Sequence, residues 1–331
     1  MKFIESHSND PEYNLSFEEY CFKNLPIENE TYLFLWINSP SIIIGKNQNA
    51  YAEINIDYVN EHNIKVVRRI TGGGAVYHDM GNLNFSIIEK NKNNKKIDFK
   101  KYYEFIIFAL RELNLNAELS GRNDVTIDGK KCIGASQAIW ENRTLSNGCI
   151  LFNVELTALS KALTVRPEKL KAKGVKSVSA RVENIFPQLQ NKISIEEFKT
   201  HLCKSIFAQR GETPTEYKLS EAELLGVQEI YKMRFSQKLW NYGKQLNTEH
   251  QRYKYFPYGA IEVFFDIENN KIKNLKILGD FFYTSDIYEL ENLLEGCLYA
   301  KEEIQKKLSE VDLTKYFGKI NKNEFVQMFF D

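Results

Sequence analysis

The sequence has no net charge and no long apolar segment, and these two absences exclude several classes of protein. Its 331 residues include 44 Lys and Arg against 44 Asp and Glu, so the chain has no overall attraction for nucleic acid or anionic lipid. No apolar run approaches the ~18 residues of a membrane span, and the first residues are acidic and amide-bearing where a signal peptide is basic and then apolar. We therefore expect a cytoplasmic protein that binds neither nucleic acid nor membrane.

The cysteines and histidines are few and scattered. Five cysteines, an odd number, include no C-x-x-C pair, and five histidines include no H-x-x-x-H pair. A chain of this length buries enough apolar surface to fold without cross-links. We expect reduced thiols and no structural metal.

The most distinctive stretch is residues 68–78, where two arginines precede three consecutive glycines. Residues 64–67 are apolar and β-branched, and residues 82–88 alternate, so the glycines lie between two predicted strands. Glycines lack Cβ atoms and let an anionic ligand approach the backbone N–H groups. Neighbouring strand residues face opposite ways, so only one arginine can point into such a site, and we predict Arg69. A bulged glycine-rich turn with surface arginines is the alternative.

Two common nucleotide-binding motifs are absent from this sequence. The G-x-G-x-x-G pattern fails because Tyr77 stands where the last glycine would be and no helical pattern follows at once. A P-loop fails because Gly121 lies eight residues before Gly129-Lys130, whereas the motif requires five. Any nucleotide site must therefore have another form.

Hydrophobic periodicity predicts a mixed α and β chain in two parts. Helices are expected at residues 12–25, 99–113, 194–209 and from 220 past 233, and strands at 31–37, 41–44, 125–127, 259–266 and 271–278. A length of about 150 residues per domain predicts two domains. The polar segment 240–252 is interpreted as a linker, which gives a large domain at 1–245 and a small α+β domain at 250–331.

Three stretches in order resemble the lipoate-protein ligase A family, within the biotin and lipoate ligase superfamily. They are residues 68–82, residues 121–124 with 131–134, and residues 172–182. Further likeness runs from the Leu-Ser-Phe-Glu-Glu at 15–19 to the Gly-Asp-Phe-Phe near 280, so it covers nearly the whole chain. The resemblance implies an α+β fold, with a large mixed-sheet catalytic domain carrying helices and a small C-terminal α+β accessory domain.

The same resemblance implies an ATP-dependent lipoate-protein ligase. Such an enzyme activates lipoate to lipoyl-AMP with Mg²⁺ and then transfers the lipoyl group to a specific lysine of a carrier. The implied carriers are the lipoyl domains of 2-oxoacid dehydrogenase E2 subunits and the glycine cleavage H protein.

The family resemblance also selects one lysine. Lys130 and Lys131 follow a hairpin signal at Asp128-Gly129, and strand alternation puts one of the two amines on the functional face. By composition alone, an exposed hairpin lysine is the alternative. The family lysine that reaches the acyl carbonyl and α-phosphate matches Lys131, which implies the catalytic role. A fixed cation there stabilises the charge that gathers on oxygen during adenylate formation and transfer.

The resemblance assigns further residues to the site. The predicted ATP and adenylate residues are Arg69, Gly74, Ala75, Val76, Tyr77, Asn82, Asp124, Lys131, Lys173 and Val178. The predicted lipoate residues are Arg69, Gly72, Gly73, His78, Lys131 and Gly134. Asp124, which by pattern is an ordinary turn or cap residue, is implied to bind Mg²⁺ because a hard cation prefers carboxylate oxygen. His78 is expected to shape the site, and the loop at 172–182 to close over the adenylate and exclude water.

Two departures from the family pattern fall near the expected acyl pocket. Ala135-Ser136 stands where Ser or Asn followed by Ala is usual, and Asn147 stands where histidine is common.

Two other functions are alternatives to the ligase. An acyltransferase of this fold would use a cysteine thioester, with Cys149 or Cys132 as the candidate, although both lie in apolar strands that favour a buried, inert thiol. A non-enzymatic protein that binds lipoate or its adenylate is the third hypothesis.

Overall fold

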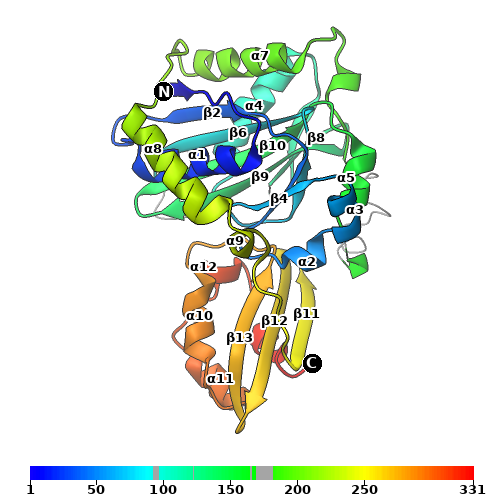
Figure 1. Cartoon of the computed structure of the whole chain (residues 1–331), viewed down its shortest axis with the longest axis vertical. Coiled ribbons are helices and arrows are strands. Elements are labelled where there is room, and N and C mark those ends of the chain that lie inside the picture. Colours follow the sequence, from blue (N-terminus) through cyan, green and yellow to red (C-terminus); the bar gives the residue numbers. More distant parts are fainter. Residues whose placement is uncertain (92–96, 122, 165, 169–181) are drawn as a thin grey trace.

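A computed structural model gives the positions of residues 1–91, 97–121, 123–164, 166–168 and 182–331 (Figure 1). A large domain lies above a smaller accessory domain, here defined as residues 250–331, and helices α2 (Ala50–Glu53) and α9 (Lys238–Tyr242) lie at their junction. Among these described residues, no helix is both long and apolar enough to cross a membrane. The five cysteines are free and buried.

The large domain is built on a seven-stranded sheet of order β1-β2-β6-β10-β9-β8-β7. Its strands are β1 Lys2–Ile4, β2 Tyr32–Trp36, β6 Asn82–Lys90, β7 Ala117–Ser120, β8 Asp124–Ile127, β9 Lys130–Trp140 and β10 Arg143–Leu151. Only the β1–β2 pair is parallel among these, and every other neighbouring pair is antiparallel.

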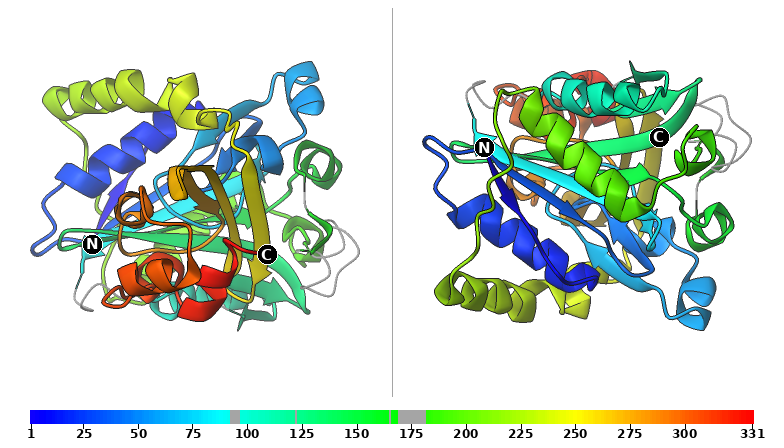
Figure 2. Two further views of the ribbon diagram at one scale, coloured as in Figure 1. Left: turned by 90° about the horizontal axis from the view of Figure 1, so that it is seen from below. Right: turned by 90° about the horizontal axis from the view of Figure 1, so that it is seen from above.

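Helices cover both faces of this sheet (Figure 2). One face packs on α4 (Lys100–Glu112) and α7 (Ile195–Ala208), and the other packs on α1 (Pro11–Asn24), α8 (Glu221–Ile230) and the π-helix Tyr231–Phe235. Because both faces are buried, β2 reads as an unbroken apolar run, with Leu33 and Leu35 toward α4 and Phe34 and Trp36 toward α1. The sheet and its helices form the scaffold for the site.

A second, three-stranded sheet of order β4-β3-β5 lies at the edge of the large domain. It contains β3 Ser41–Ile44, β4 Lys65–Arg68 and β5 Val76–His78, with β3 parallel to β4 and antiparallel to β5. Residues 69–75, here called the glycine loop, join β4 to β5. The short helices α3 Ile56–Glu61 and α5 Leu156–Ala162 share an apolar core with this sheet, whereas the 3-10 turn Phe186–Gln188 packs on the core that contains α4 and α7.

The accessory domain has an antiparallel sheet, β11 His250–Phe256, β12 Gly259–Glu268 and β13 Lys271–Gly279, and its own apolar core. Four helices cover this sheet: α10 Ile287–Leu294, α11 Lys301–Lys307, α12 Thr314–Phe317 and α13 Lys322–Gln327. The β12–β13 turn uses Asn269 and Asn270 at φ of 50° and 58°, which is the geometry of a type I′ hairpin. This turn lies between the two strands that the sequence predicts at 259–266 and 271–278.

The predicted linker at 240–252 is shorter in the structure. Helix α9 extends to Tyr242 and β11 begins at His250, so residues 243–249 alone connect the two elements. The helix is held by tertiary contacts, because the backbone N–H of Arg68 donates to Asn241 Oδ1 and the guanidinium donates to the Trp240 carbonyl. A helix of five residues that is held by contacts with distant residues has no hydrophobic periodicity of its own, so the sequence did not indicate it. The domain boundaries at 245 and 250 stay a prediction.

Candidate functional site

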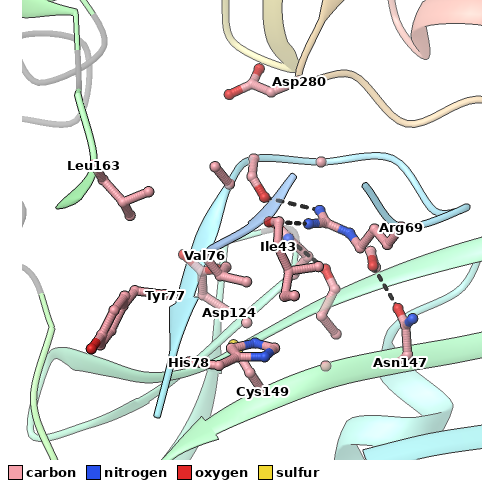
Figure 3. A pocket seen from close by; sticks show the side chains of 18 of the residues that line it. Ile43, Arg69, Val76, Tyr77, His78, Asp124, Asn147, Cys149, Leu163 and Asp280 are labelled. Atoms are coloured by element: carbon pink, nitrogen blue, oxygen red, sulfur yellow. Dashed lines mark hydrogen bonds between the residues drawn. The ribbon is translucent and has the colours of Figure 1, made fainter. Parts of the chain in front are cut away.

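A cavity of about 230 Å³ lies between the two sheets of the large domain and the accessory domain (Figure 3). Its floor is a row of residues directly opposite one another on five neighbouring strands: Trp36, Asn84, Cys149, Gly134 and Asp124. Paired residues of antiparallel strands point to the same face. Register alone therefore gathers residues from 36 to 149 on one surface.

Arg69 organises the glycine loop above this floor. Its guanidinium donates to the carbonyl oxygens of Ile43 at 3.1 Å, Gly72 at 2.7 Å and Gly74 at 2.9 Å, and its Nε donates to Thr71 Oγ1 at 3.0 Å. Burial lowers the pKa of Arg69 to about 10, so the group stays charged at neutral pH. Arg69 lines the cavity as the alternation of strand residues predicts.

Arg68 points the other way and joins neighbouring backbone segments. Its Nη1 donates to the carbonyl oxygens of Gly45, Lys46 and Gln48, at 3.0, 3.0 and 2.6 Å. Neither arginine is on the surface, so the alternative of a turn with surface arginines does not describe this loop.

The three glycines of the loop meet different requirements. A Cβ on Gly72 would lie 2.5 Å from the Phe281 carbonyl oxygen of the accessory domain. Gly73 has a φ of 93°, and a Cβ there would lie 3.1 Å from the Phe282 ring. Gly73 and Gly74 line the cavity together with Ala75, Val76 and Tyr77, whereas Gly72 is not part of the wall formed by the described residues. The lack of a Cβ atom therefore allows the accessory domain to pack against Gly72 and Gly73, and it leaves the backbone of Gly73 and Gly74 open to the cavity.

Lys131 projects into the cavity and Lys130 projects away from it. The Lys131 amine lies 2.7 Å from Asp124 Oδ1, while the Lys130 amine pairs with Glu183 at 3.1 Å. Gly134 makes room for this amine, because a Cβ there would lie 2.7 Å from Lys131 Nζ. An irregularity in the β8–β9 register, between Val125 and Thr126, sets this arrangement.

His78 is a neutral, buried donor at the edge of the floor. Asn14 donates to the side-chain oxygen of Asn38, so the Asn38 amide group faces His78 Nδ1, at 3.2 Å. Nδ1 then accepts, and the proton lies on Nε2, which has no partner among the described residues. Burial, with a smaller effect of the Arg69 charge, lowers the pKa of His78 to about 3. A ring with this pKa is a poor general base.

The accessory domain supplies part of the cavity wall. Tyr255, Gly259, Asp280 and Phe282 line it from the side opposite the sheet, and Figure 3 shows Asp280 there. Phe282 packs edge-on against Phe99 of the large domain, with ring centres 5.2 Å apart. Asp280 and Phe282 belong to the Gly-Asp-Phe-Phe stretch near 280, so this stretch is the sequence signal for the accessory-domain wall of the cavity.

Five further wall residues are apolar side chains of the kind that fills a protein core: Leu15, Trp36, Ile43, Leu159 and Leu163. Asn84 and Val182 also line the cavity, as do Ser136 and Asn147, at which the sequence departs from the family pattern. The predicted residue Asn82 is buried, donates to Asn84 Oδ1 at 2.9 Å, and is not part of the cavity wall formed by the described residues. Lys173 and Val178, like Arg122, fall outside the described residues.

The two candidate thiols have the electrostatics of core residues. Burial raises the pKa of Cys132 to about 12 and also raises the pKa of Cys149, although the charge of Lys131 opposes both shifts. Cys149 lines the cavity, but a thiol with a raised pKa is not an activated nucleophile. These properties disfavour the thioester mechanism.

Comparison with known proteins gives the class to which this fold and site belong. Residues 10–207 match the lipoyl protein ligase A/B catalytic domain, and residues 245–329 match the bacterial lipoate protein ligase C-terminus. The chain is 44% identical to lipoate–protein ligase 1 of Staphylococcus aureus over 99% of both chains, and 44% identical to a Bacillus subtilis lipoate-protein ligase over 100% of both. The chain therefore belongs to the lipoate-protein ligase family.

Solved structures agree with this assignment. LipL1 of P. falciparum in complex with lipoate has a TM-score of 0.80 and 28% identity, covering 98% of this chain and 97% of its own. A bipartite lipoate protein ligase from Thermoplasma acidophilum, studied as part of an archaeal lipoylation system together with its E2 lipoyl domain, has a TM-score of 0.66 and 29% identity, covering 75% and 98%. A lipoate-protein ligase A bound with ATP has a TM-score of 0.63 and 26% identity, covering 73% and 98%. The predicted fold and the predicted ATP-dependent ligase are confirmed.

Proposed function

We propose that this enzyme joins free lipoate to a lysine of lipoyl carrier domains in the cytosol, with lipoyl-AMP as intermediate and Mg²⁺ as metal. The observation that carries the proposal is the position of the Lys131 amine, which projects over Gly134 into a cavity that the glycine loop closes from above. The lipoate and ATP bound in related structures support the two substrates.

The cavity has an apolar part and a polar part, as an acyl-adenylate requires. Leu15, Trp36 and Ile43 offer apolar surface to the acyl chain, while Lys131 and Asp124 lie at the other end of the floor. We place the lipoate carboxylate near Lys131, with His78 and Gly134 shaping the wall around it. The carboxylate oxygen attacks the α-phosphorus and pyrophosphate leaves, while the amine stabilises the charge on the phosphoryl oxygens.

The nucleotide is assigned to the glycine loop and its continuation into β5. Gly74, Ala75, Val76 and Tyr77 line the cavity and offer backbone groups to it. Arg69, whose donors hold the loop carbonyls, acts in this proposal through the shape of the loop as well as through its charge. Lys173 and Val178 are assigned to the adenylate by the family resemblance alone.

Mg²⁺ would be held by Asp124 together with phosphate oxygens. Within the described ranges, no three His, Cys, Asp or Glu side chains gather in a way that could hold a metal ion by themselves. A single carboxylate with substrate phosphates is a usual environment for Mg²⁺, which keeps much of its hydration shell. The ion would supply positive charge to the leaving pyrophosphate.

In the second half-reaction the carrier lysine attacks the acyl carbonyl, the amide bond forms and AMP leaves. Lys131 is positioned to stabilise the oxyanion of this step as well. The acceptors we propose are lipoyl domains of 2-oxoacid dehydrogenase E2 subunits and the glycine cleavage H protein. The archaeal relative, which has an E2 lipoyl domain as its partner in a lipoylation system, supports the first of these.

Pyrophosphate release with ATP, Mg²⁺ and lipoate, followed by intact-mass analysis of an added apo lipoyl domain, tests the proposal. Both signals are expected from the wild type and from Lys130→Ala, since Lys130 projects away from the cavity. Lipoate binding without pyrophosphate release would contradict the proposal. Pyrophosphate release with no mass gain, either on an apo lipoyl domain or on apo glycine cleavage H protein, would contradict the transfer step.

A further inference from the structure

A series of side-chain hydrogen bonds joins the glycine loop to helix α1 beside the cavity. Arg69 Nε donates to Thr71 Oγ1 at 3.0 Å, the Thr71 and Ser136 hydroxyl oxygens are 2.7 Å apart, and Ser136 Oγ donates to Asn147 Oδ1 at 2.6 Å. Asn147 Nδ2 then lies 2.9 and 3.1 Å from the two carboxylate oxygens of Glu18. All five side chains are buried.

This series, Arg69–Thr71–Ser136–Asn147–Glu18, is here called the relay. The direction of each hydrogen bond follows from its two ends, because the Arg69 guanidinium can only donate and the Asn147 amide nitrogen donates to Glu18. Ser136 gives its one proton to Asn147, so the Thr71 hydroxyl must donate to Ser136 and is left to accept from Arg69. Every bond therefore points from the guanidinium toward the Glu18 carboxyl group. Hydrogen bonds aligned in this way polarise one another in a buried, low-dielectric setting, so the series holds its geometry as a unit.

The sheet register fixes one end of the relay. Ser136 and Asn147 lie directly opposite each other on β9 and β10, two residues along from the cavity floor. Ser86 lies opposite Asn147 on β6 and donates its hydroxyl to Glu18, while Trp36 Nε1 donates to Ser86. The other end is the glycine loop, which has few side chains with which to hold its own shape.

We infer that Thr71 is a positioning residue for adenylate formation, because it holds the Arg69 guanidinium in line with the sheet and thereby fixes the Gly72 and Gly74 carbonyls. Thr71 is fully buried and is not part of the cavity wall formed by the described residues, so it acts through these neighbours. The inference rests on the proposed function and gives a role to Thr71, which lies in the 68–78 stretch but is not among the site residues that the family resemblance assigns.

Two substitutions at Thr71 separate its hydroxyl from its volume. Thr71→Val keeps the branched side chain but replaces the hydroxyl with a methyl group, so the buried Arg69 Nε loses its acceptor, whereas Thr71→Ser keeps the hydroxyl. With a misplaced loop, we expect the KM for ATP in pyrophosphate release to rise about tenfold in Thr71→Val. The KM for lipoate, to which Arg69, Gly72 and Gly73 are also assigned, should rise by a smaller factor. Thr71→Ser should stay within about twofold of the wild type in both constants. A smaller folded fraction would lower the rate without changing either KM.

Ser136→Ala breaks the relay at the next bond and provides a second test. Thr71 Oγ1 also lies 3.4 Å from Asn147 Oδ1, so part of the link survives and the rise in the KM for ATP should be smaller than in Thr71→Val. The matched control is Ser146→Ala, next to Asn147 but bonded to Gln137 at 2.8 Å and outside the relay. This control should leave the KM for ATP unchanged.

The Arg69 Nε–H resonance in a ¹⁵N correlation spectrum gives a readout that does not depend on activity. It should shift in Thr71→Val and persist near its wild-type position in Thr71→Ser. An unchanged KM for ATP in Thr71→Val, an equal rise in Thr71→Ser, or a rise in the KM for lipoate alone would overturn the inference. A wild type that releases no pyrophosphate would refute the proposed function instead, and an unshifted Arg69 resonance in Thr71→Val would then refute the relay.

Discussion

Replacing Glu18 with glutamine should change how the stability of this protein depends on pH. Burial raises the pKa of the Glu18 carboxyl from 4.5 to about 7, although hydrogen bonds from Ser86 and Asn147 and the charge of Arg69 act in the opposite direction. The folded state therefore holds this proton more tightly than the unfolded chain does. The resulting loss of stability is absent below pH 4.5, grows between pH 4.5 and 7, and is constant at higher pH.

The size of the effect follows from these two pKa values. At about 1.36 kcal/mol per pKa unit, ionisation of Glu18 lowers the free energy of unfolding by about 2.5 kcal/mol between pH 5 and pH 8. Glutamine has nearly the same shape and does not ionise, so the stability of Glu18→Gln relative to wild type should rise by this amount. His78 acts in the opposite sense, because burial lowers its pKa to about 3 and its contribution is lost as pH falls from 6.5. His78 is present in both proteins and cancels in the difference.

Urea unfolding of both proteins at pH 5, 6, 7 and 8, followed by tryptophan fluorescence, measures this difference. All three tryptophans, at positions 36, 140 and 240, precede the accessory domain, so the signal reports the large domain. A difference in the free energy of unfolding that changes by less than about 0.5 kcal/mol from pH 5 to pH 8 would refute the reasoning. A change of the opposite sign would refute it as well.

Three further predictions concern the reaction. Lys131→Ala should reduce pyrophosphate release about 10²- to 10³-fold, as loss of one charge-stabilising group does, and near wild-type release would exclude the assigned role. Gly134→Ala should lower pyrophosphate release at least about tenfold with little change in melting temperature, because the added Cβ displaces only the flexible Lys131 amine. In the control Gly148→Ala, the added Cβ would lie 2.5 Å from the Gly134 carbonyl oxygen, so the melting temperature should fall. Asp124→Asn should raise the Mg²⁺ concentration for half-maximal rate about tenfold, and an unchanged Mg²⁺ titration would remove Asp124 as a ligand.

Local signals in the sequence predict the elements that depend on local chemistry. Asp128 and Gly129 take φ values of 49° and 81° at the tip of the β8–β9 hairpin, and Ser194 and Glu197 form the capping box that begins α7. Strand alternation likewise separates Lys131, in the cavity, from Lys130, paired with Glu183 outside it. Each of these features is fixed by residues within a few positions of one another.

Other parts of the site depend on contacts between distant segments, and the sequence does not signal them. Glu18 and Glu19 share a helical pattern with apolar residues, yet only the fold shows that Glu18 meets Asn147 while Glu19 pairs with Lys23 and Arg234. The relay from Arg69 to Glu18 requires the register of β9 with β10, the glycine loop and helix α1 all to be placed correctly at once. A polar residue in such a relay has no local property that separates it from a polar residue on the surface.

The glycine loop shows why a motif can be recognised correctly and still be explained incompletely. The proposed access of a ligand to the backbone would account for Gly73 and Gly74, which line the cavity, but not for Gly72. There the missing side chain is required by the Phe281 carbonyl of the accessory domain, and the Tyr283 hydroxyl donates to the Ile70 carbonyl at 2.7 Å beside it. Residues 69–75 thus bond to strand β3 through the Arg69 side chain, and their backbone contacts the accessory domain. Two different constraints have the same consequence in the sequence, because both exclude a Cβ atom.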